Sequence, residues 1–311
     1  MKVFNAEPFA YSEPARKSWV DAGYDYLAGS WEEVEAPSFT SDAEILIVRL
    51  ARKVDEEILN KFPRLSKIFS ATTGHDHIDE AAIAERKIEL VSLRGHEEFL
   101  RTIPSTAEHT WALMMSLIRY IPSANEHVRS GAWDRDQFRS YQLQGKILGI
   151  IGYGRTGQKI ATYARAFNMS VIYYDPNVSL DPDCKRASMK DVFQQADILS
   201  FHVHLNEETT HLLNQENIGF IKPGTYLLNT SRGKIWEESA VAQALEKKAI
   251  KGVAVDVLAE EMESEKLSPL RQALVDGQNI IITPHIAGAT WDAISTCEEF
   301  LVKNMLGLSK N

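Results

Sequence analysis

A glycine triplet that directly follows a short apolar run is the feature that most constrains this 311-residue chain. The run, Ile147–Ile151, predicts a buried strand, and after Gly152–Gly157 apolar residues resume at helical spacing. Gly152 permits the tight turn, Gly154 lets the backbone approach a pyrophosphate, and Gly157 lets the helix pack closely on the strand. The N–H groups that open the helix then face the phosphates. This order is the context that a dinucleotide-binding fingerprint requires.

An acidic residue at the end of the next predicted strand supports this interpretation. Ser170–Tyr174 has strand character and is followed by Asp175, about twenty residues beyond the last glycine, as the fingerprint requires. A carboxylate there is placed to accept hydrogen bonds from the adenosine ribose hydroxyls. It would repel a 2′-phosphate, so we expect NAD rather than NADP. The alternative, a glycine turn that merely packs, does not explain the acid.

Composition excludes several classes of protein. Hydrophobic residues make up 44% and charged residues 25% of the chain, which is ordinary for a soluble globular protein. The net charge of −9 argues against general nucleic-acid binding, which needs a basic face. No apolar run approaches a membrane span or a signal-peptide core. Cys184 and Cys297 lie far apart without metal or redox spacing, so we expect no metal site and a reduced, cytoplasmic setting.

Strands alternate with helices before the fingerprint. Apolar runs predict strands, and capped periodic segments predict helices, at 2–5, 12–22, 44–49, 55–62, 67–71, 79–86 and 88–93 in turn. Such alternation predicts a parallel sheet covered on both faces. A longer helix, 106–119, leads towards the fingerprint, so we place a domain boundary near residue 102.

The alternation resumes after the fingerprint. Counting from Ile147, six strands are expected, the number in a complete dinucleotide-binding sheet. Helices are expected at 214–220 and 238–247, and a last helix at 290–306 that passes back to the first domain. The stretch 122–144 is polar and aromatic and includes Trp133. It is interpreted either as an oligomer surface or as loop packing.

Three polar segments end strands of the predicted cofactor sheet. They are 229–233, 256–261 and 283–288. In open α/β sheets ligands bind beyond the carboxyl ends of strands. We therefore expect Arg232, Glu261 and His285 to converge on one crevice.

These three side chains suit hydride transfer from an alcohol to nicotinamide. A histidine can remove the hydroxyl proton near neutral pH, and a neighbouring carboxylate favours the imidazolium and holds the ring. A guanidinium can grip a substrate carboxylate with two hydrogen bonds and polarise the reacting carbonyl. Alone, each residue is more simply a surface charge or a hydrogen-bonding loop residue. Their combination downstream of the fingerprint favours catalysis by Arg232, Glu261 and His285.

The chain resembles the D-isomer-specific 2-hydroxyacid dehydrogenases, which include phosphoglycerate, glyoxylate/hydroxypyruvate and D-lactate dehydrogenases. The resemblance is strongest over 106–291. It is carried by Ala107-Glu-His109, Leu148-Gly-Ile-Ile-Gly-Tyr-Gly-Arg-Thr-Gly157, Asn229-Thr-Ser-Arg-Gly233, Asp256-Val257 and Thr283-Pro-His-Ile-Ala-Gly288. It implies that Arg232 binds the substrate carboxylate and carbonyl, that Glu261 orients the histidine, and that His285 is the acid/base.

The resemblance also implies ligand contacts. Those expected at the cofactor, besides the three glycines and Asp175, are Arg155, Thr156, His204, Thr230, Ser231, Asp256 and Gly288. His204 stands where the family usually has proline, and Asp256 has an alternative role as a buried acid that caps backbone amides. Those expected at the substrate, besides Arg232, are Arg49, Thr73, Gly74 and His75.

Together these patterns predict an α/β protein with two domains. A Rossmann NAD-binding domain is expected over 102–290. A flavodoxin-like substrate domain is expected from 1–101 and 291–311. The predicted function is reversible, NAD-dependent oxidation of a D-2-hydroxy acid by a homodimer. Arg49, with help from Arg94, favours a large anionic acid such as 3-phosphoglycerate. One alternative is an NAD-sensing binding protein like the related co-repressors. The other is formate oxidation, which the three side chains suit less well because formate has no hydroxyl proton to remove.

Overall fold

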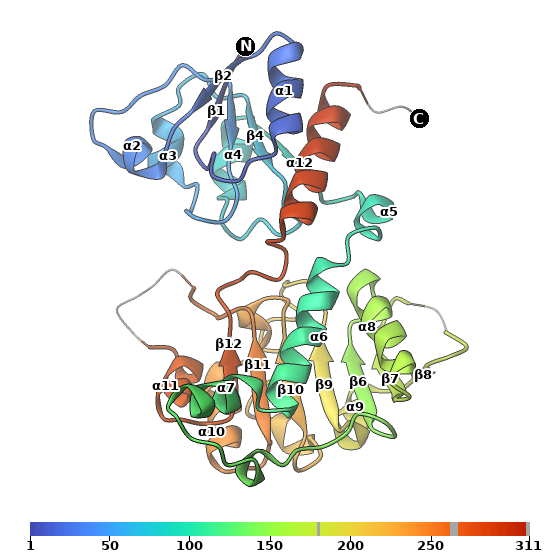
Figure 1. The fold of residues 1–311 in the computed structure, drawn as a ribbon. Coiled ribbons are helices and arrows are strands. Elements are labelled where there is room, and N and C mark those ends of the chain that lie inside the picture. The colour runs from blue at the N-terminus through green and yellow to red at the C-terminus, as the bar shows by residue number, and fades with distance from the viewer. Residues whose placement is uncertain (179–180, 262–266, 309–311) are drawn as a thin grey trace. The chain divides into compact units, whose positions relative to one another are not determined.

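The chain forms two compact units in the computed structural model, which describes residues 1–178, 181–261 and 267–308. Unit 1 comprises Met1–Thr102 and the segment that starts at Ala289, and unit 2 comprises Ile103–Gly288 (Figure 1). Each unit has its own parallel sheet, so each is described separately.

The sheet of unit 1 has five parallel strands. In spatial order they are β2 (Asp25–Ala28), β1 (Lys2–Asn5), β3 (Ile45–Ile47), β4 (Lys67–Ser70) and β5 (Glu89–Ser92). This 2-1-3-4-5 order is the flavodoxin-like arrangement, as predicted. The prediction omitted β2, an edge strand whose residues are largely exposed, so the apolar pattern of a buried strand is missing there.

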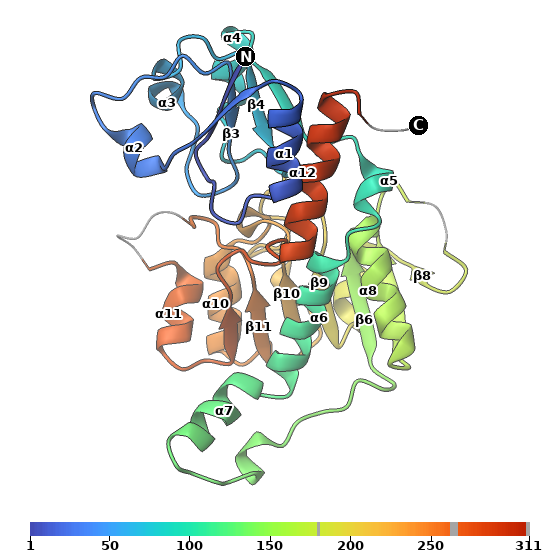
Figure 2. The ribbon, with the colours of Figure 1, turned by 45° about the horizontal axis from the view of Figure 1, so that its top comes forward.

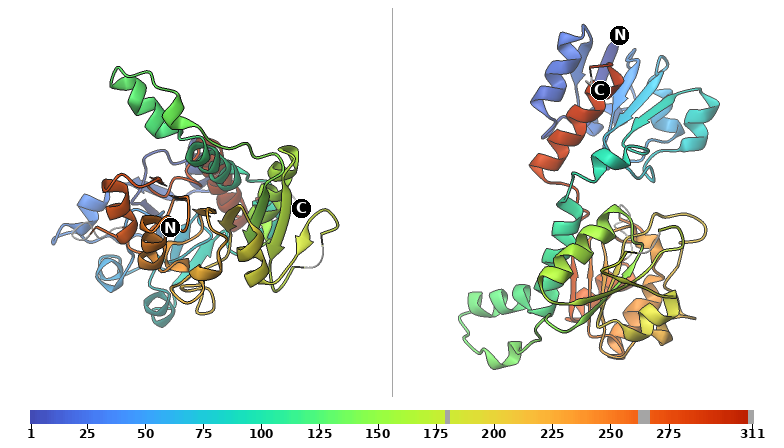
Figure 3. Two further views of the ribbon diagram at one scale, coloured as in Figure 1. Left: turned by 90° about the horizontal axis from the view of Figure 1, so that it is seen from below. Right: turned by 90° about the vertical axis from the view of Figure 1, so that its right-hand side faces the viewer.

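Helices cover both faces of this sheet. On one face α1 (Glu13–Asp21) packs against α12 (Trp291–Met305), and the views of Figure 3 show these two helices side by side. The other face is covered by α2 (Trp31–Glu35), α3 (Glu56–Asn60) and α4 (Glu80–Glu85). Ser12 caps α1 through the N–H of Ala15, which stabilises a helix start typically by about 1 kcal/mol. The C-terminal helix therefore completes the core of unit 1.

The sheet of unit 2 has seven parallel strands rather than the six predicted. In spatial order they are β12 (Ile280–Ile282), β11 (Gly252–Val255), β10 (Tyr226–Asn229), β9 (Ile198–Phe201), β6 (Ile147–Ile151), β7 (Ser170–Tyr174) and β8 (Lys185–Arg186). The additional strand, β8, is an exposed pair of basic residues at the sheet edge, which carries no apolar signal. From β6 the chain adds β7 and β8 on one side, and then β9 to β12 on the other side. The boundary between β6 and β9 is therefore the switch point at which open α/β sheets bind ligands.

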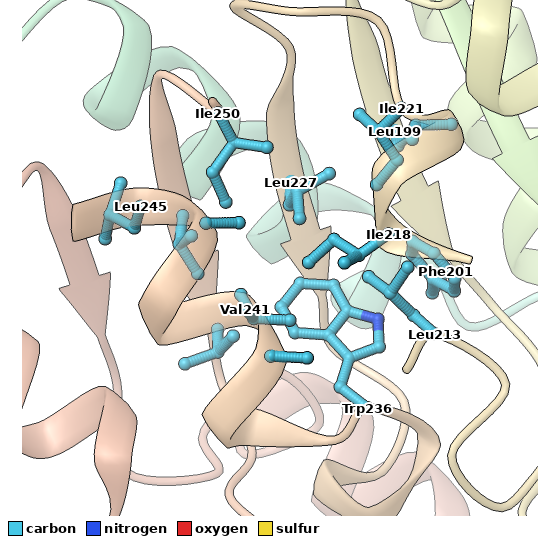
Figure 4. Close-up of a cluster of buried hydrophobic side chains, with 14 of the residues drawn as sticks. Leu199, Phe201, Leu213, Ile218, Ile221, Leu227, Trp236, Val241, Leu245 and Ile250 are labelled. Atoms are coloured by element: carbon cyan, nitrogen blue, oxygen red, sulfur yellow. The ribbon is translucent and has the colours of Figure 1, made fainter. Parts of the chain in front are cut away.

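Two helical layers bury this sheet. One contains α6 (Ser105–Ile118) and α8 (Arg155–Ala166), and the other contains α9 (Met189–Gln195), α10 (Glu238–Glu246) and α11 (Pro269–Val275). Figure 4 shows the second layer, where Trp236 lies among Leu213, Ile218 and Val241. Its ring meets Phe201 edge-on, with the centroids 5.3 Å apart. This tryptophan follows the turn that carries Arg232, so the core anchors that turn.

Two segments of unit 2 differ from the prediction. The predicted helix over 214–220 is only a short 3₁₀ turn, Ile218–Phe220, because Asn214 and Asn217 bond locally to backbone groups instead. Within 122–144 a helix, α7 (Ile121–Arg129), extends away from the sheet (Figures 2 and 3) and buries none of its residues. The short α5 (Glu97–Leu100) belongs to unit 1. No helix in the described part of the chain is long and apolar enough to cross a membrane.

Candidate active site

The three predicted catalytic residues follow neighbouring strands of unit 2. Arg232 comes after β10, Glu261 after β11 and His285 after β12, and these strands pair in parallel. Their carboxyl ends therefore form one edge of the sheet. The structure places the three residues after strands whose carboxyl ends share that edge.

His285 and Glu261 are in direct contact. The Nδ1 atom of His285 lies 2.8 Å from Oε2 of Glu261, and both side chains are partly exposed. The carboxylate fixes the ring by its Nδ1 side, which leaves Nε2 to face a ligand. His285 has a φ of 54°, a left-handed conformation that is uncommon for residues other than glycine and recurs at functional sites. The surrounding turn must hold it there.

The buried carboxylate of Asp256 holds this turn. Its Oδ1 accepts hydrogen bonds from the hydroxyl of Thr283 at 2.5 Å and from the N–H of Ile286 at 2.9 Å, and its Oδ2 accepts from the N–H of Ala287 at 2.8 Å. His109 on α6 adds an Nε2 atom 3.3 Å from Oδ1. The side chain of Asp256 has 0% exposure. These are the amide-capping contacts of the alternative role, and they act on both sides of His285.

The turn that carries Arg232 is fixed by its own polar side chains. Asn229 donates its Nδ2 to the carbonyl of Arg232 and accepts from the N–H of Ser231, both at 2.9 Å. The hydroxyl of Ser231 donates to the carbonyl of Phe201 at 2.6 Å, and the hydroxyls of Thr230 and Thr110 lie 2.7 Å apart. These contacts tie the turn to β9 and to α6.

Gly233 lets two of the three segments that carry the predicted catalytic residues approach each other. A Cβ atom at this position would lie 1.9 Å from the carbonyl carbon of Leu258 and 2.2 Å from the nitrogen of Ala259. No side chain larger than hydrogen fits there. In the same loop, the buried Glu238 accepts a hydrogen bond from the N–H of Ala259 at 2.7 Å. The close approach of Gly233 and the hydrogen bond to Glu238 therefore both position the backbone that leads to Glu261.

The glycine triplet has the geometry of a phosphate-binding turn. Gly152 has a φ of +93°, and a Cβ there would lie 2.4 Å from the carbonyl oxygen of His202. A Cβ on Gly157 would lie 2.3 Å from the carbonyl oxygen of Gly152, whereas Gly154 faces open space. Tight turn, open approach and close helix packing are the three roles of the fingerprint glycines.

Backbone donors at the start of α8 are available to a ligand. Gly154 is the N-cap and has no side chain that could cap the helix. No described residue accepts a hydrogen bond from the N–H of Gly154, Thr156 or Gly157. First-turn amides and the helix dipole together attract an anion. This turn therefore fits a pyrophosphate.

Asp175 lies at the end of β7, and its carboxylate accepts hydrogen bonds from backbone N–H groups. Its Oδ2 accepts from the N–H of Tyr153 at 2.8 Å, and its Oδ1 accepts from Asn177 at 2.8 Å and Val178 at 3.0 Å. These bonds orient the acid beside the glycine turn. They leave Oδ2 with capacity to accept a further hydrogen bond.

The remaining predicted cofactor positions lie in loops of unit 2. His204 is exposed after β9, and its carbonyl accepts from the hydroxyl of Thr209 at 2.6 Å. Gly288 is exposed in the turn beyond His285. His202, which was not among the predicted residues, contacts the hydroxyl of Ser200 through Nε2 at 2.8 Å, and burial lowers its pKa to about 3. It is therefore a neutral hydrogen-bonding residue.

In unit 1 the loop after β4 presents unpaired amides. No described residue accepts a hydrogen bond from the N–H of Thr73, Gly74 or His75. The loop is held by the hydroxyl of Thr72, which donates to the carbonyl of Gly74, and by Glu80, whose Oε1 lies 3.1 Å from Nδ1 of His75. Free backbone amides in a loop are donors that can bind an anion.

Arg49 is committed to a buried acid. Its Nε and Nη2 donate to Oε1 of Glu298 at 2.9 and 2.6 Å, and its Nη1 donates to the carbonyl of Phe9 at 2.8 Å. Only 19% of the side chain is exposed. Oε2 of Glu298 accepts from the N–H of Ser12 at 2.6 Å. These contacts join α12, α1 and the end of β3.

Sequence reasoning missed the residues that support these turns. His109 and Glu238 reach the segments that they hold from helices far away in the chain. Ala107-Glu-His109 was noted as part of the family resemblance, but no local pattern assigns a role to His109. Glu238 reads as an ordinary first-turn helix acid. Only folding shows what they contact.

Comparisons with known proteins identify the family of this chain. A family model described as D-isomer specific 2-hydroxyacid dehydrogenase, NAD binding domain, matches residues 111–287. A D-3-phosphoglycerate dehydrogenase of Bacillus subtilis is 37% identical over 265 residues, covering 84% of this chain and 48% of that protein. A glyoxylate reductase of Thermococcus litoralis is 30% identical over 298 residues, covering 90% and 86%.

The fold also matches a solved relative. A D-lactate dehydrogenase of Aquifex aeolicus, crystallised with NAD and lactic acid, superposes with a TM-score of 0.81 at 28% identity, covering 98% of this chain and 94% of that one. The present chain spans about half the length of the phosphoglycerate dehydrogenase that it matches. On its family-model match, its curated relatives and its fold, the chain belongs to the D-isomer specific 2-hydroxyacid dehydrogenase family.

Proposed function

We propose that this protein is an NAD-dependent dehydrogenase that interconverts a D-2-hydroxy acid and its 2-oxo acid. The observation that carries the proposal is the 2.8 Å contact between Nδ1 of His285 and Glu261. It stands at the sheet edge that also carries Arg232 and lies in the same unit as a turn that fits a dinucleotide. An acid/base pair and a cation beside a nicotinamide site are the parts that this reaction requires.

The catalytic side chains have separate roles in this proposal. His285 accepts the hydroxyl proton of the acid at Nε2, while Glu261 holds the ring at Nδ1 and stabilises the imidazolium that forms. Arg232 pairs with the substrate carboxylate and polarises the C2 carbonyl. In the direction of oxidation, NAD, when bound, accepts the hydride that leaves C2. In reduction His285 returns the proton to the new hydroxyl.

Cofactor binding falls to the glycine turn and the neighbouring strand ends. The amides of Gly154, Thr156 and Gly157 would hold the pyrophosphate, and Asp175 would accept from the adenosine ribose hydroxyls. We infer a preference for NAD over NADP from this acid. Asp256, whose carboxylate has no exposed surface, acts in our proposal as a positioning residue for His285.

Substrate binding involves unit 1. The free amides of Thr73, Gly74 and His75 are donors suited to a carboxylate. Arg49 is less available, because the buried Glu298 already neutralises its charge. The amides are therefore our preferred carboxylate-binding group in this unit.

A panel of 2-oxo acids assayed with NADH and with NADPH tests the function. We expect turnover with NADH and a much lower rate with NADPH. His285→Gln should lower kcat by about a hundredfold to ten-thousandfold, the usual contribution of an acid/base group, while the Kd for NADH changes little. Tight NADH binding without turnover of any acid would instead support the binding-protein alternative.

We also propose that the chain forms a homodimer through the arm that contains α7. No residue of α7 is buried. The arm exposes Ile121, Val128 and Trp133, and 86% of the surface of Trp133 is accessible. A projecting apolar surface of this kind marks a protein interaction site. Sedimentation of the wild type should give a dimer, and Trp133→Asp should shift it towards the monomer. A monomeric wild type at micromolar concentration would refute the assignment.

A further inference from the structure

We propose that Arg94 determines specificity by binding a second anionic group on the substrate, so that the protein prefers 2-oxo acids with a carboxylate or phosphate at their far end. This inference rests on the proposed dehydrogenase function and names its substrate class. It moves the charge recognition from Arg49, at the end of β3, to a residue that follows β5.

The position of Arg94 carries the first part of the argument. β5 lies next to β4 in the sheet, and the N–H of Leu93 donates to the carbonyl of Thr72 at 3.0 Å. Arg94 therefore follows the strand end beside the free amides of Thr73–His75. Neighbouring strands lie only about 4.8 Å apart. A substrate held by those amides would have its far end within reach of the guanidinium.

Shared contacts carry the second part. Oε1 of Glu80 lies 3.4 Å from Nη1 of Arg94 and 3.1 Å from Nδ1 of His75. One carboxylate oxygen thus holds both the guanidinium and the last residue of the amide loop. Burial, followed by the charge of Arg94, lowers the pKa of His75. The guanidinium of Arg94 is therefore the permanently charged cation that its contact with Glu80 places beside this loop.

Availability distinguishes Arg94 from Arg49, the arginine of unit 1 for which the family resemblance implies substrate binding. Arg49 is 19% exposed and faces a carboxylate that is 2% exposed. Arg94 is 59% exposed, and its partner Glu80 is 53% exposed. An exposed ion pair contributes little stability, so a substrate anion can replace Glu80 at small cost. The same exchange at Arg49 would leave a buried carboxylate without its cation.

Matched substrates test the proposal with the full-length enzyme. Hydroxypyruvate and 3-phosphohydroxypyruvate differ only by the phosphate, and 2-oxobutyrate and oxaloacetate differ at the far end by a carboxylate. We expect the wild type to have a kcat/KM at least tenfold higher for the charged member of one pair. The pair that shows this preference identifies the anion as phosphate or carboxylate. The preference should shrink at 0.5 M salt, because screening weakens an exposed charge.

Arg94→Ala should lower kcat/KM for the charged substrate about tenfold to a hundredfold, the usual value of a hydrogen bond to a charged group. The uncharged partner should change by less than about twofold. Glu80→Gln should act in the opposite direction and raise the preference, because it removes the competing negative charge. Arg52→Ala is the matched control, since Arg52 is 51% exposed and also pairs with a glutamate, Glu35, at 2.7 Å.

Several results would overturn the proposal. The wild type could prefer the uncharged member of both pairs. Arg94→Ala could lower kcat/KM equally for the charged and the uncharged substrate. Arg52→Ala could reduce the preference for the charged substrate as much as Arg94→Ala does. The absence of turnover with every acid would defeat the dehydrogenase assignment instead. In that case the role of Arg94 is tested by calorimetry, which compares the Kd of D-malate with the Kd of D-2-hydroxybutyrate. A preference for D-malate that is unchanged in Arg94→Ala refutes the role of Arg94.

Discussion

Replacing Asp256 by asparagine separates its two interpretations, cofactor contact and support for the histidine turn. The carboxylate accepts from Ile286 and Thr283 through one oxygen and from Ala287 through the other. An asparagine offers one oxygen and one NH₂ group, so either the part-buried N–H of Ile286 or the buried N–H of Ala287 must face a donor. The substitution therefore acts on the turn that holds His285.

The expected cost follows from these bonds. Losing a hydrogen bond to a charged group costs about 1.5–3 kcal/mol, and leaving a buried N–H unpaired costs about 1–3 kcal/mol. The two effects overlap in part, so we expect the turn to be destabilised by about 3 kcal/mol. This corresponds to a roughly hundredfold increase in local opening. Because His285 holds a left-handed φ of 54°, release of the turn should displace it.

Hydrogen exchange measures this opening directly. In Asp256→Asn the amides of Ile286 and Ala287 should lose about a hundredfold of their protection. The kcat should fall about tenfold to a hundredfold, as for a small misplacement of a catalytic group, and the Kd for NADH should stay within about threefold. Asp197→Asn is the control, because that carboxylate also accepts from a backbone N–H, that of Ile147, but precedes β9 at the opposite edge of the sheet.

Two results would refute this reasoning. Unchanged exchange at both amides would show that the carboxylate does not hold the turn. A loss of NADH affinity with kcat preserved would favour the role in cofactor binding.

Three further changes test other parts of the structure. Gly233→Ala should lower kcat and the unfolding midpoint because its Cβ would clash with the Leu258 carbonyl. Gly219→Ala, whose Cβ would meet no atom within 4 Å, should change neither. Equal effects of the two substitutions would contradict the close approach at Gly233. Burial raises the pKa of Glu298. The stability of the wild type relative to Glu298→Gln should therefore be greatest below the ordinary pKa of 4.5 and should decline as pH rises through the raised pKa. A stability difference that stays constant from pH 4 to 8 would contradict this prediction. Arg232→Lys should raise KM more than it lowers kcat, because ammonium lacks the bidentate fork; an unchanged KM would remove Arg232 from substrate binding.

Much of the fold could be predicted because its signals are local. The buried strands of a parallel sheet are continuous apolar runs, as at 147–151, and their residue types identify them without tertiary information. Capped helices such as α1 are equally explicit. The omitted strands, β2 and β8, are exposed edges, where no burial requirement acts on the sequence. The false helix over 214–220 fails because asparagine side chains compete for backbone hydrogen bonds.

The catalytic candidates were predictable for a different reason. Chemistry requires particular side chains, and a parallel sheet places every strand's carboxyl end at the same edge. Arg232, Glu261 and His285 could therefore be associated although 29 and 24 residues separate them along the chain. The sequence alone determined the glycine turn, the order of the buried strands, and the residue types proposed for catalysis.

Tertiary structure decided what supports those groups and which charges are available. The carboxylate of Asp256 caps the turn of His285, and Glu298 takes up the charge of Arg49. Each contact joins residues far apart in the chain, and its strength depends on burial. Neither property has a local pattern, because a carboxylate reads the same in sequence whether it faces solvent, a backbone amide or a guanidinium.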